Sequence, residues 1–164
     1  MAIEVGDTAP DFELRDNHGR TVRLSDLHGH GHGRDADADA DAVNVVLVFY
    51  PFAFTSVCTD EMRALRDGLP ALTADDTVLL AVSNDSIHTL RVFAEQEGLE
   101  FPLLSDFWPH GEVSRAYGVF DEEKGCAVRG TFIMDKEGVV RWKIVNGLPD
   151  ARDLQQYVRA LDAL

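Results

Sequence analysis

The chain has 164 residues, 45% of them apolar and 27% charged, which is ordinary for one soluble globular domain spanning residues 1–164. A formal net charge of −14 argues against electrostatic binding of nucleic acid or of an anionic membrane. No apolar run approaches the ~20 residues that span a bilayer, and the N-terminus lacks the features of a signal peptide. We therefore expect a cytoplasmic protein.

Strand signals come first along the chain. Residues 12–15 and 21–24 flank a polar turn at 17–19 and predict a β-hairpin. The nearly continuous apolar run 43–50 predicts a strand that is covered on both faces.

A low-complexity segment, residues 28–42, separates the hairpin from this strand. It alternates His with Gly and then Asp with Ala, and it has almost no large apolar side chain to repay its ordering entropy. We interpret it as a flexible surface insertion. If the segment is extended, His28, His30 and His32 lie on one side and could bind a transition metal weakly. The alternative is a polar loop without a ligand.

A helix is predicted after the strand. From Cys58 onward, apolar residues recur at the spacing of one helix face, at Met62, Leu65 and Leu69. Asp60 and Glu61 are expected in its first turn, where acidic side chains suit the helix dipole. Gly68 and Pro70 should weaken or kink it.

The second half of the chain continues the alternation. Residues 77–83 form another buried run, and Ser86 suits the N-cap of a helix through about Glu97 that ends at Gly98. A strand at 101–104, a helix at 111–117 and a hairpin of 131–134 with 139–145 are predicted next. Pro149-Asp150 then opens a closing helix that turns Leu154, Tyr157, Val158 and Leu161 inward. This order indicates an α/β fold, a central mixed sheet with helices on both faces.

Cys58 lies where the buried strand meets the helix. Free backbone N–H groups and the positive end of the dipole at a helix N-terminus favour thiolate over thiol, and thiolate is the nucleophile. The spacing Pro51-x-x-x-Thr55-x-x-Cys58 adds a proline that could shield the sulfur. It also adds a hydroxyl that can turn toward sulfur and substrate. For Cys58 the alternative is a buried structural thiol, and for Thr55 it is a plain helix cap.

This motif resembles the active-site motif of the peroxiredoxins, Pro-x-x-x-Thr/Ser-x-x-Cys. Segments 5–14, 101–106 and 129–135 are similar to further segments of that family. Residues 105–111 with 116–120 are similar to the AhpE-type one-cysteine peroxiredoxins, close to the bacterioferritin-comigratory group. The resemblance covers nearly the whole chain, and the insertion 28–42 departs from it.

The resemblance implies a thioredoxin-like fold with an N-terminal β-hairpin extension. It also implies cofactor-free, thiol-dependent reduction of hydrogen peroxide and organic hydroperoxides. Cys58 would be the peroxidatic cysteine, Thr55 would hydrogen-bond the peroxide oxygens and Pro51 would close the pocket. Arg129 would hold the thiolate and the peroxide, and Glu61 would orient that arginine. The alternatives are a surface ion pair for Arg129 and a plain N-terminal helix acid for Glu61.

The second cysteine, Cys126, does not match the usual resolving positions of that family. A disulfide with Cys58 needs Cα atoms within ~7 Å and would require a loop movement. An intramolecular resolving role, an intermolecular disulfide and a non-catalytic thiol remain open. A one-cysteine cycle is the working hypothesis, in which a low-molecular-weight thiol or a redoxin protein reduces the sulfenic acid.

Two other classes of function remain from the sequence. The same cysteine could serve a redox sensor or a chaperone that oxidises without turnover, or the histidine segment could sequester metal. A homodimer is expected, since the family that the chain resembles often pairs across the face near the active-site loop.

Overall fold

The computed structural model describes residues 3–28, 42–73, 76–147 and 152–164. Within these residues, a seven-stranded mixed sheet in the order β2-β1-β5-β4-β3-β8-β9 forms the centre of the molecule. Its strands are β1 (Glu13–Asp16), β2 (Thr21–Arg23), β3 (Asn44–Phe49), β4 (Thr77–Ser83), β5 (Leu103–Ser105), β8 (Arg129–Met134) and β9 (Val140–Asn146). No helix of the described residues is long and apolar enough to cross a membrane.

The central strand β3 explains why the sheet is buried on both faces. It pairs in parallel with β4 and antiparallel with β8, so both of its edges are hydrogen-bonded. Val45 to Phe49 are all 0% exposed, as the continuous apolar run requires. The strand therefore ends deep inside the protein, and the next residues, Tyr50 and Pro51, are buried as well.

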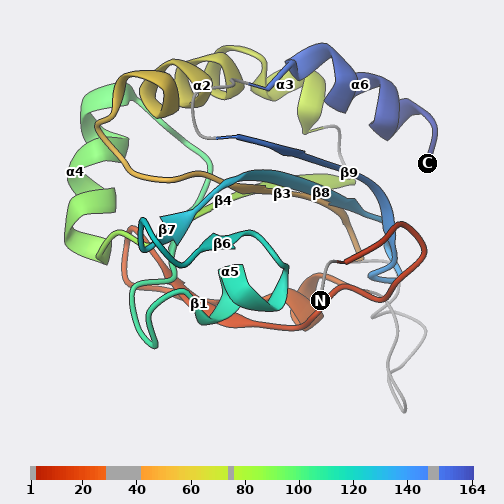
Figure 1. Ribbon diagram of the computed structural model, residues 1–164. Helices are drawn as coiled ribbons and strands as arrows, with labels where there is room; N and C mark the ends of the chain where they lie inside the picture. The colour runs from red at the N-terminus through yellow and green to blue at the C-terminus, as the bar shows by residue number, and fades with distance from the viewer. Residues whose placement is uncertain (1–2, 29–41, 74–75, 148–151) are drawn as a thin grey trace.

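One face of the sheet carries the longer helices. These are α2 (Ser56–Asp67), the short α3 (Leu69–Leu72), α4 (Ile87–Glu97) and α6 (Leu154–Asp162). Figure 1 shows α2, α3 and α6 in a row above the sheet, with α4 at one end of the row. Cys58 and Met62 of α2, Phe93 of α4 and Tyr157 of α6 share one apolar core with the sheet residues beneath them.

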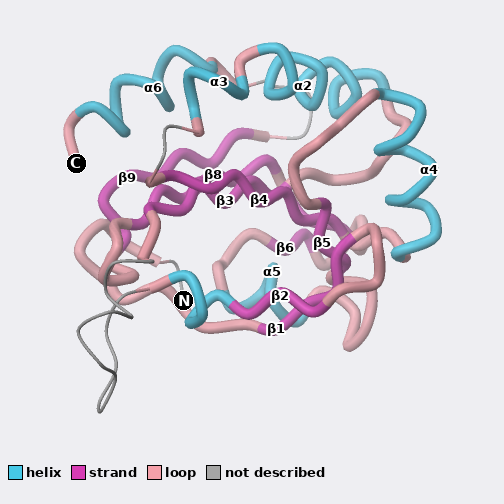
Figure 2. The backbone as a smooth tube through the Cα atoms, turned by 180° about the vertical axis from the view of Figure 1, so that it is seen from behind, coloured by secondary structure: helices cyan, strands magenta, loops and turns pink. Residues whose placement is uncertain are grey.

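The opposite face is covered by shorter elements. The 3₁₀ turn η1 (Leu24–Leu27), α5 (Glu112–Ala116) and a small hairpin of β6 (Phe120–Asp121) with β7 (Cys126–Ala127) lie there, as both views show (Figures 1 and 2). The ring of Tyr117 packs against Phe49 and Phe132 at 5.3 and 5.2 Å between centroids. Helices therefore cover both faces of a mixed sheet, and the predicted thioredoxin-like α/β class is confirmed.

Most predicted elements are present with shifts of one or two residues, and the N-terminal hairpin forms as β1 and β2. Ser86 caps α4 by accepting the N–H of Thr89, and Gly98 ends that helix with φ = 65°. The hairpin of β8 and β9 begins at Arg129, two residues before the predicted start. The two-residue strands β6 and β7 and the turn η1 were not predicted.

The helix after Cys58 needs a correction. It begins at Ser56, so Asp60 and Glu61 lie in the second turn and not in the first. It ends at Asp67, and Leu69 belongs to the separate helix α3. Pro70 has no N–H with which to continue the ladder, which accounts for the break after Gly68. The inward face of α6 is as predicted, but the prediction that Pro149-Asp150 opens it falls outside the described residues, and Asp153 is its N-cap.

His28 does not belong to a surface insertion. It is only 7% exposed, and its ring lies against Gly138 in the turn between β8 and β9, where a Cβ would stand 2.5 Å from Nδ1. Contact with this turn buries the ring and corrects the expected surface position of His28, while the weak metal site itself stays a prediction. His30 and His32 lie outside the described residues. Within those that are described, no group of three metal-ligating side chains could hold an ion.

Candidate active site

The sulfur of Cys58 sits at the buried start of α2. Thr55 is the N-cap of this helix, with extended backbone angles, and Cys58 is its third residue. The amide groups of a first helical turn have no intrahelical acceptor, so they present partial positive charge to the thiol. Cys58 is 0% exposed.

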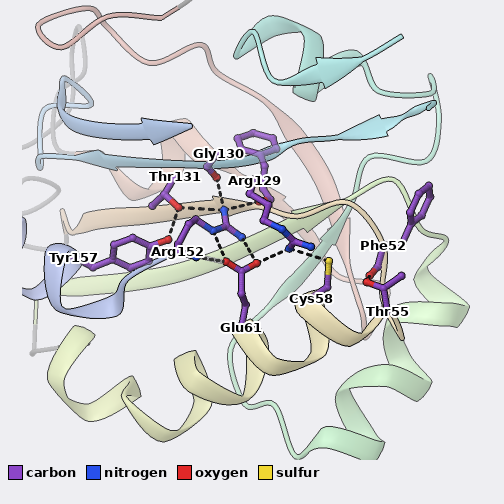
Figure 3. A network of polar contacts seen from close by, with 10 residues as sticks. Phe52, Thr55, Cys58, Glu61, Arg129, Gly130, Thr131, Arg152 and Tyr157 are labelled. Atoms are coloured by element: carbon purple, nitrogen blue, oxygen red, sulfur yellow. Dashed lines mark hydrogen bonds and ion pairs between the residues drawn. The ribbon is translucent and has the colours of Figure 1, made fainter. Parts of the chain in front are cut away.

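Arg129 reaches the sulfur from the first residue of β8. Its Nη1 donates to Cys58 Sγ at 3.1 Å and to Glu61 Oε1 at 2.5 Å (Figure 3). The arginine side chain is 4% exposed, so it is not the surface ion pair that remained as an alternative. The fold thus brings together three residues that the sequence singled out, from positions 58, 61 and 129.

A second arginine, Arg152, completes the cluster, and no motif in the sequence pointed to it. Its backbone N–H and its Nε both donate to Glu61 Oε2, at 2.8 and 2.9 Å, and its Nη2 donates to Oε1 at 3.1 Å. Its Nη1 donates to the carbonyl oxygens of Phe49 and Gly130 and to Thr131 Oγ1. Arg152 therefore fastens the ends of β3 and β8 to the carboxylate that holds Arg129.

The charges of this cluster balance when the thiol is ionised. Burial opposes ionisation of Glu61, but the hydrogen bonds and charge of Arg152, together with the charge of Arg129, outweigh it and lower the pKa of Glu61. Figure 3 shows the carboxylate between the two guanidinium groups. Two guanidinium groups then face one carboxylate, so a thiolate at Cys58 makes the cluster neutral.

Thr55 and Pro51 lie in the loop that leads from β3 to α2. The Thr55 hydroxyl donates to the carbonyl oxygen of Phe52 at 2.8 Å, so its hydrogen is used within the loop and is not turned to the sulfur (Figure 3). Its oxygen still has lone pairs for a donor such as a peroxide hydroxyl. Pro51 is buried directly after Tyr50 and ends the extended segment.

Cys126 has a different environment. It lies in β7, is 1% exposed and, like Cys58, is a free cysteine. Burial raises the pKa of the Cys126 thiol; the charges of Asp121 and Cys58 raise it further, while Lys124 and Arg129 act in the opposite direction. These surroundings keep Cys126 protonated.

Comparisons with known proteins place the chain in a family. The AhpC/TSA family model matches residues 5–143. The chain is 45% identical to alkyl hydroperoxide reductase E of Mycobacterium tuberculosis over 162 residues, 99% of this chain and 98% of that protein. It is 35% identical to a thioredoxin peroxidase of Echinococcus granulosus, with coverages of 99% and 82%.

Solved structures are similar to the chain as well. Peroxidoxin BcpB of Mycobacterium tuberculosis superposes with a TM-score of 0.81 at 30% identity, covering 99% of this chain and 98% of that one. The reduced 2-Cys peroxiredoxin of Plasmodium vivax also gives 0.81, at 28% identity and with coverages of 97% and 80%. On the family match and these identities, the chain belongs to the AhpC/TSA family of peroxiredoxins.

Proposed function

We propose that Cys58 is the peroxidatic nucleophile of this thiol-dependent peroxidase, with Arg129, Thr55 and Pro51 forming the peroxide site around it. The observation that carries the proposal is the hydrogen bond from Arg129 Nη1 to Cys58 Sγ at 3.1 Å, made inside a buried cluster that favours an anion. A cationic donor at this distance stabilises the thiolate and stands where the attacked peroxide must bind.

The first step is a two-electron oxidation of sulfur. The thiolate attacks one peroxide oxygen in line with the O–O bond, so an S–O bond forms as the O–O bond breaks. The second oxygen leaves with the electron pair and takes a proton, giving water from hydrogen peroxide and an alcohol from an organic hydroperoxide. Negative charge grows on that leaving oxygen, and the guanidinium of Arg129 is a fixed donor placed to stabilise it.

Glu61 and Arg152 act through Arg129. The carboxylate of Glu61 accepts from Arg129 on one side and from Arg152 on the other, which fixes the direction of the Arg129 fork. Since the side chains of both arginines and of Glu61 are at most 6% exposed, water does not compete for these bonds. We assign Glu61 and Arg152 as positioning residues.

The second step needs an external thiol. The sulfenic acid on Cys58 condenses with a reductant thiol, releasing water and forming a mixed disulfide that a second thiol cleaves. A low-molecular-weight thiol or a redoxin protein would supply both. Cys126 takes no part in this one-cysteine cycle. A cycle that consumes thiols, in a chain whose two cysteines are free, suits a reducing compartment such as the cytoplasm.

We also propose a homodimer. Exposed aromatic side chains occur in the active-site loop, at Phe52 and Phe54, and after β5, at Phe107 and Trp108. Trp108 is 79% exposed, which is costly for an isolated indole in water. Light scattering should therefore give about twice the mass of one chain at micromolar concentration.

The proposed function is tested by replacing Cys58 with Ser and measuring peroxide consumption with an added thiol reductant. Loss of consumption is expected, and survival of it would contradict the proposal. A sensor or chaperone with the same cysteine would be oxidised once without steady-state turnover. Continuous turnover by the unaltered protein therefore separates the enzyme from that alternative.

A further inference from the structure

The loop between β3 and α2 is strained. Phe54, between Pro51 and Cys58, has φ = 69°, in the left-handed region that side chains other than glycine rarely adopt. Strain of this kind persists only where the surrounding structure holds it. The loop that leads from β3 to α2 must therefore be held by contacts at Phe54 or next to it.

Two contacts from distant segments fasten it. The ring of Phe54 packs against Phe93 of α4, with centroids 5.0 Å apart. The backbone N–H of Ala53 donates to Asp85 Oδ2 at 2.8 Å. Asp85 lies two residues beyond the end of β4, 32 positions from Ala53 along the chain, so it ties the loop to the main sheet.

Asp85 is itself anchored on two strands. Ser83, the last residue of β4, donates its hydroxyl to the same carboxylate oxygen at 2.7 Å. Ser105, the last residue of β5, donates its hydroxyl to the backbone carbonyl of Asp85 at 2.5 Å. The carboxylate thus has a fixed position relative to the sheet. Its bond to Ala53 holds the loop at a fixed position relative to the sheet as well.

We propose that Asp85 is a positioning residue for the peroxide reaction, holding the loop 51–55 closed over Cys58 through the N–H of Ala53. This inference rests on the proposed role of Cys58. Asp85 would not touch the peroxide. It would act by keeping Thr55 and the start of α2 in the alignment that an in-line attack needs, where a displacement of about 1 Å can cost about 10²-fold in rate.

The energetics of Asp85 agree with a functional placement. Burial raises the pKa of its carboxyl, although the hydrogen bonds from Ala53 and Ser83 act in the opposite direction. Burial also raises the pKa of the neighbouring Tyr50 phenol, and the charges of Asp85 and Cys58 raise it further. A carboxylate kept where its charge is disfavoured costs stability near neutral pH, and functional sites commonly carry such costs.

The test compares three variants in the full chain. Asp85→Ala removes the bond to Ala53, whereas Asp85→Asn keeps an amide oxygen that can still accept it. Asp106→Asn is the matched control, because Asp106 is a buried carboxylate with a raised pKa, directly after β5, whose hydrogen bonds go to residues outside the loop. Stopped-flow fluorescence gives the rate constant for oxidation of Cys58 by hydrogen peroxide. Alkylation by iodoacetamide at the same pH reports the thiolate and its accessibility.

Asp85→Ala is expected to lose about 10²-fold in the peroxide rate constant, because misplacement of the loop disrupts alignment. Its alkylation rate should stay level or rise, since Cys58 is 0% exposed while the loop is closed. Asp85→Asn should lose about tenfold, as a neutral acceptor replaces a charged one. Asp106→Asn should keep the rate constant of the unaltered protein.

A wild-type peroxide rate in Asp85→Ala overturns the inference, and so does an equal loss in peroxide and alkylation rates. If Asp85→Ala fails to fold, Asp85→Asn and Asp106→Asn decide: a loss confined to Asp85→Asn supports the inference, and equal rates overturn it. These results leave the proposed function intact. Failure of the unaltered protein to react with peroxide would overturn both.

Discussion

Cys58 and Cys126 are equally hidden from water and differ in almost everything else. Both are at most 1% exposed. Cys58 has a guanidinium nitrogen 3.1 Å from its sulfur and lies in the first turn of α2. Cys126 lies in a two-residue strand, and burial raises the pKa of its thiol. Burial alone therefore does not decide whether a thiol reacts; the fixed donors that compensate an anion decide it.

The largest effect expected from this comparison is the loss of Cys58 itself. Cys58→Ser should reduce the rate of peroxide consumption by at least about 10³-fold, because a serine hydroxyl at neutral pH is not an anionic nucleophile. Cys126→Ser is the matched control, since it makes the same change in an equally buried thiol. Similar losses in the two variants would remove the distinction between the two cysteines.

The next largest effect is expected from Arg129, the hydrogen-bond donor that distinguishes Cys58 from Cys126. Arg129→Lys keeps the positive charge but loses the rigid guanidinium whose Nη1 contacts both Cys58 and Glu61. We expect the rate constant for oxidation by hydrogen peroxide to fall about 10²-fold, the usual cost of a lost transition-state donor. Arg141→Lys, on an exposed pair with Asp135, is the control and should leave the rate unchanged. An unaltered rate in Arg129→Lys would mean that charge suffices.

The carboxylate between the two arginines should affect stability as well as rate. Glu61→Gln leaves two buried guanidinium groups without their anion, so the free energy of unfolding at pH 7 should fall by about 3 kcal/mol. The pKa of Glu61 is lowered in the folded protein, so its contribution to stability is present above the unfolded carboxyl pKa of about 4.3 and is lost as the pH falls through the folded value.

Urea unfolding of Glu61→Gln and of the unaltered protein between pH 3 and 7 measures this effect. The difference should be largest at neutral pH and should shrink in acid. Glu97→Gln is the control, because Glu97 also pairs with an arginine, Arg63, which is half-exposed. The hydrogen bond of Arg63 lowers the pKa of Glu97 as well, so its effect should also shrink in acid, but it should be much smaller at every pH. A constant difference for Glu61→Gln across this range would contradict the assignment of an ionised, buried Glu61.

The parts of the fold that the sequence predicted are those with a local signal. The run that became β3 is apolar except for Asn44, and the Ser86 cap and the Gly98 stop are specified within a few residues of α4. The hairpin of β6 and β7 has only two residues in each strand, too few for a periodic pattern. The burial of His28 has no local signal either, because it depends on a turn more than 100 residues away.

The candidate site divides in the same way. Pro51, Thr55 and Cys58 form one short motif, and Arg129 follows from the family resemblance. Arg152 has partners in three distant segments, at Phe49, Glu61 and Gly130, and no motif of its own. The one available signal was indirect: a carboxylate that pairs with Arg129 neutralises its charge, so holding a thiolate at Cys58 as well needs a second positive charge. Asp85 was not predicted for the same reason, since its partner Ala53 lies 32 positions away.

The smallest expected effect comes from replacing Cys126, and it tests whether this thiol is as unreactive as its surroundings indicate. Cys126→Ser should change the peroxide rate constant by less than about twofold, because its protonated thiol is neither a donor to the peroxide nor a nucleophile. Mass spectrometry of the peroxide-treated, unaltered protein should find Cys58 as sulfenic or sulfinic acid and no peptide that links the two cysteines. A linked peptide would make Cys126 a resolving cysteine despite its raised pKa. Such a bond needs the two Cα atoms within ~7 Å.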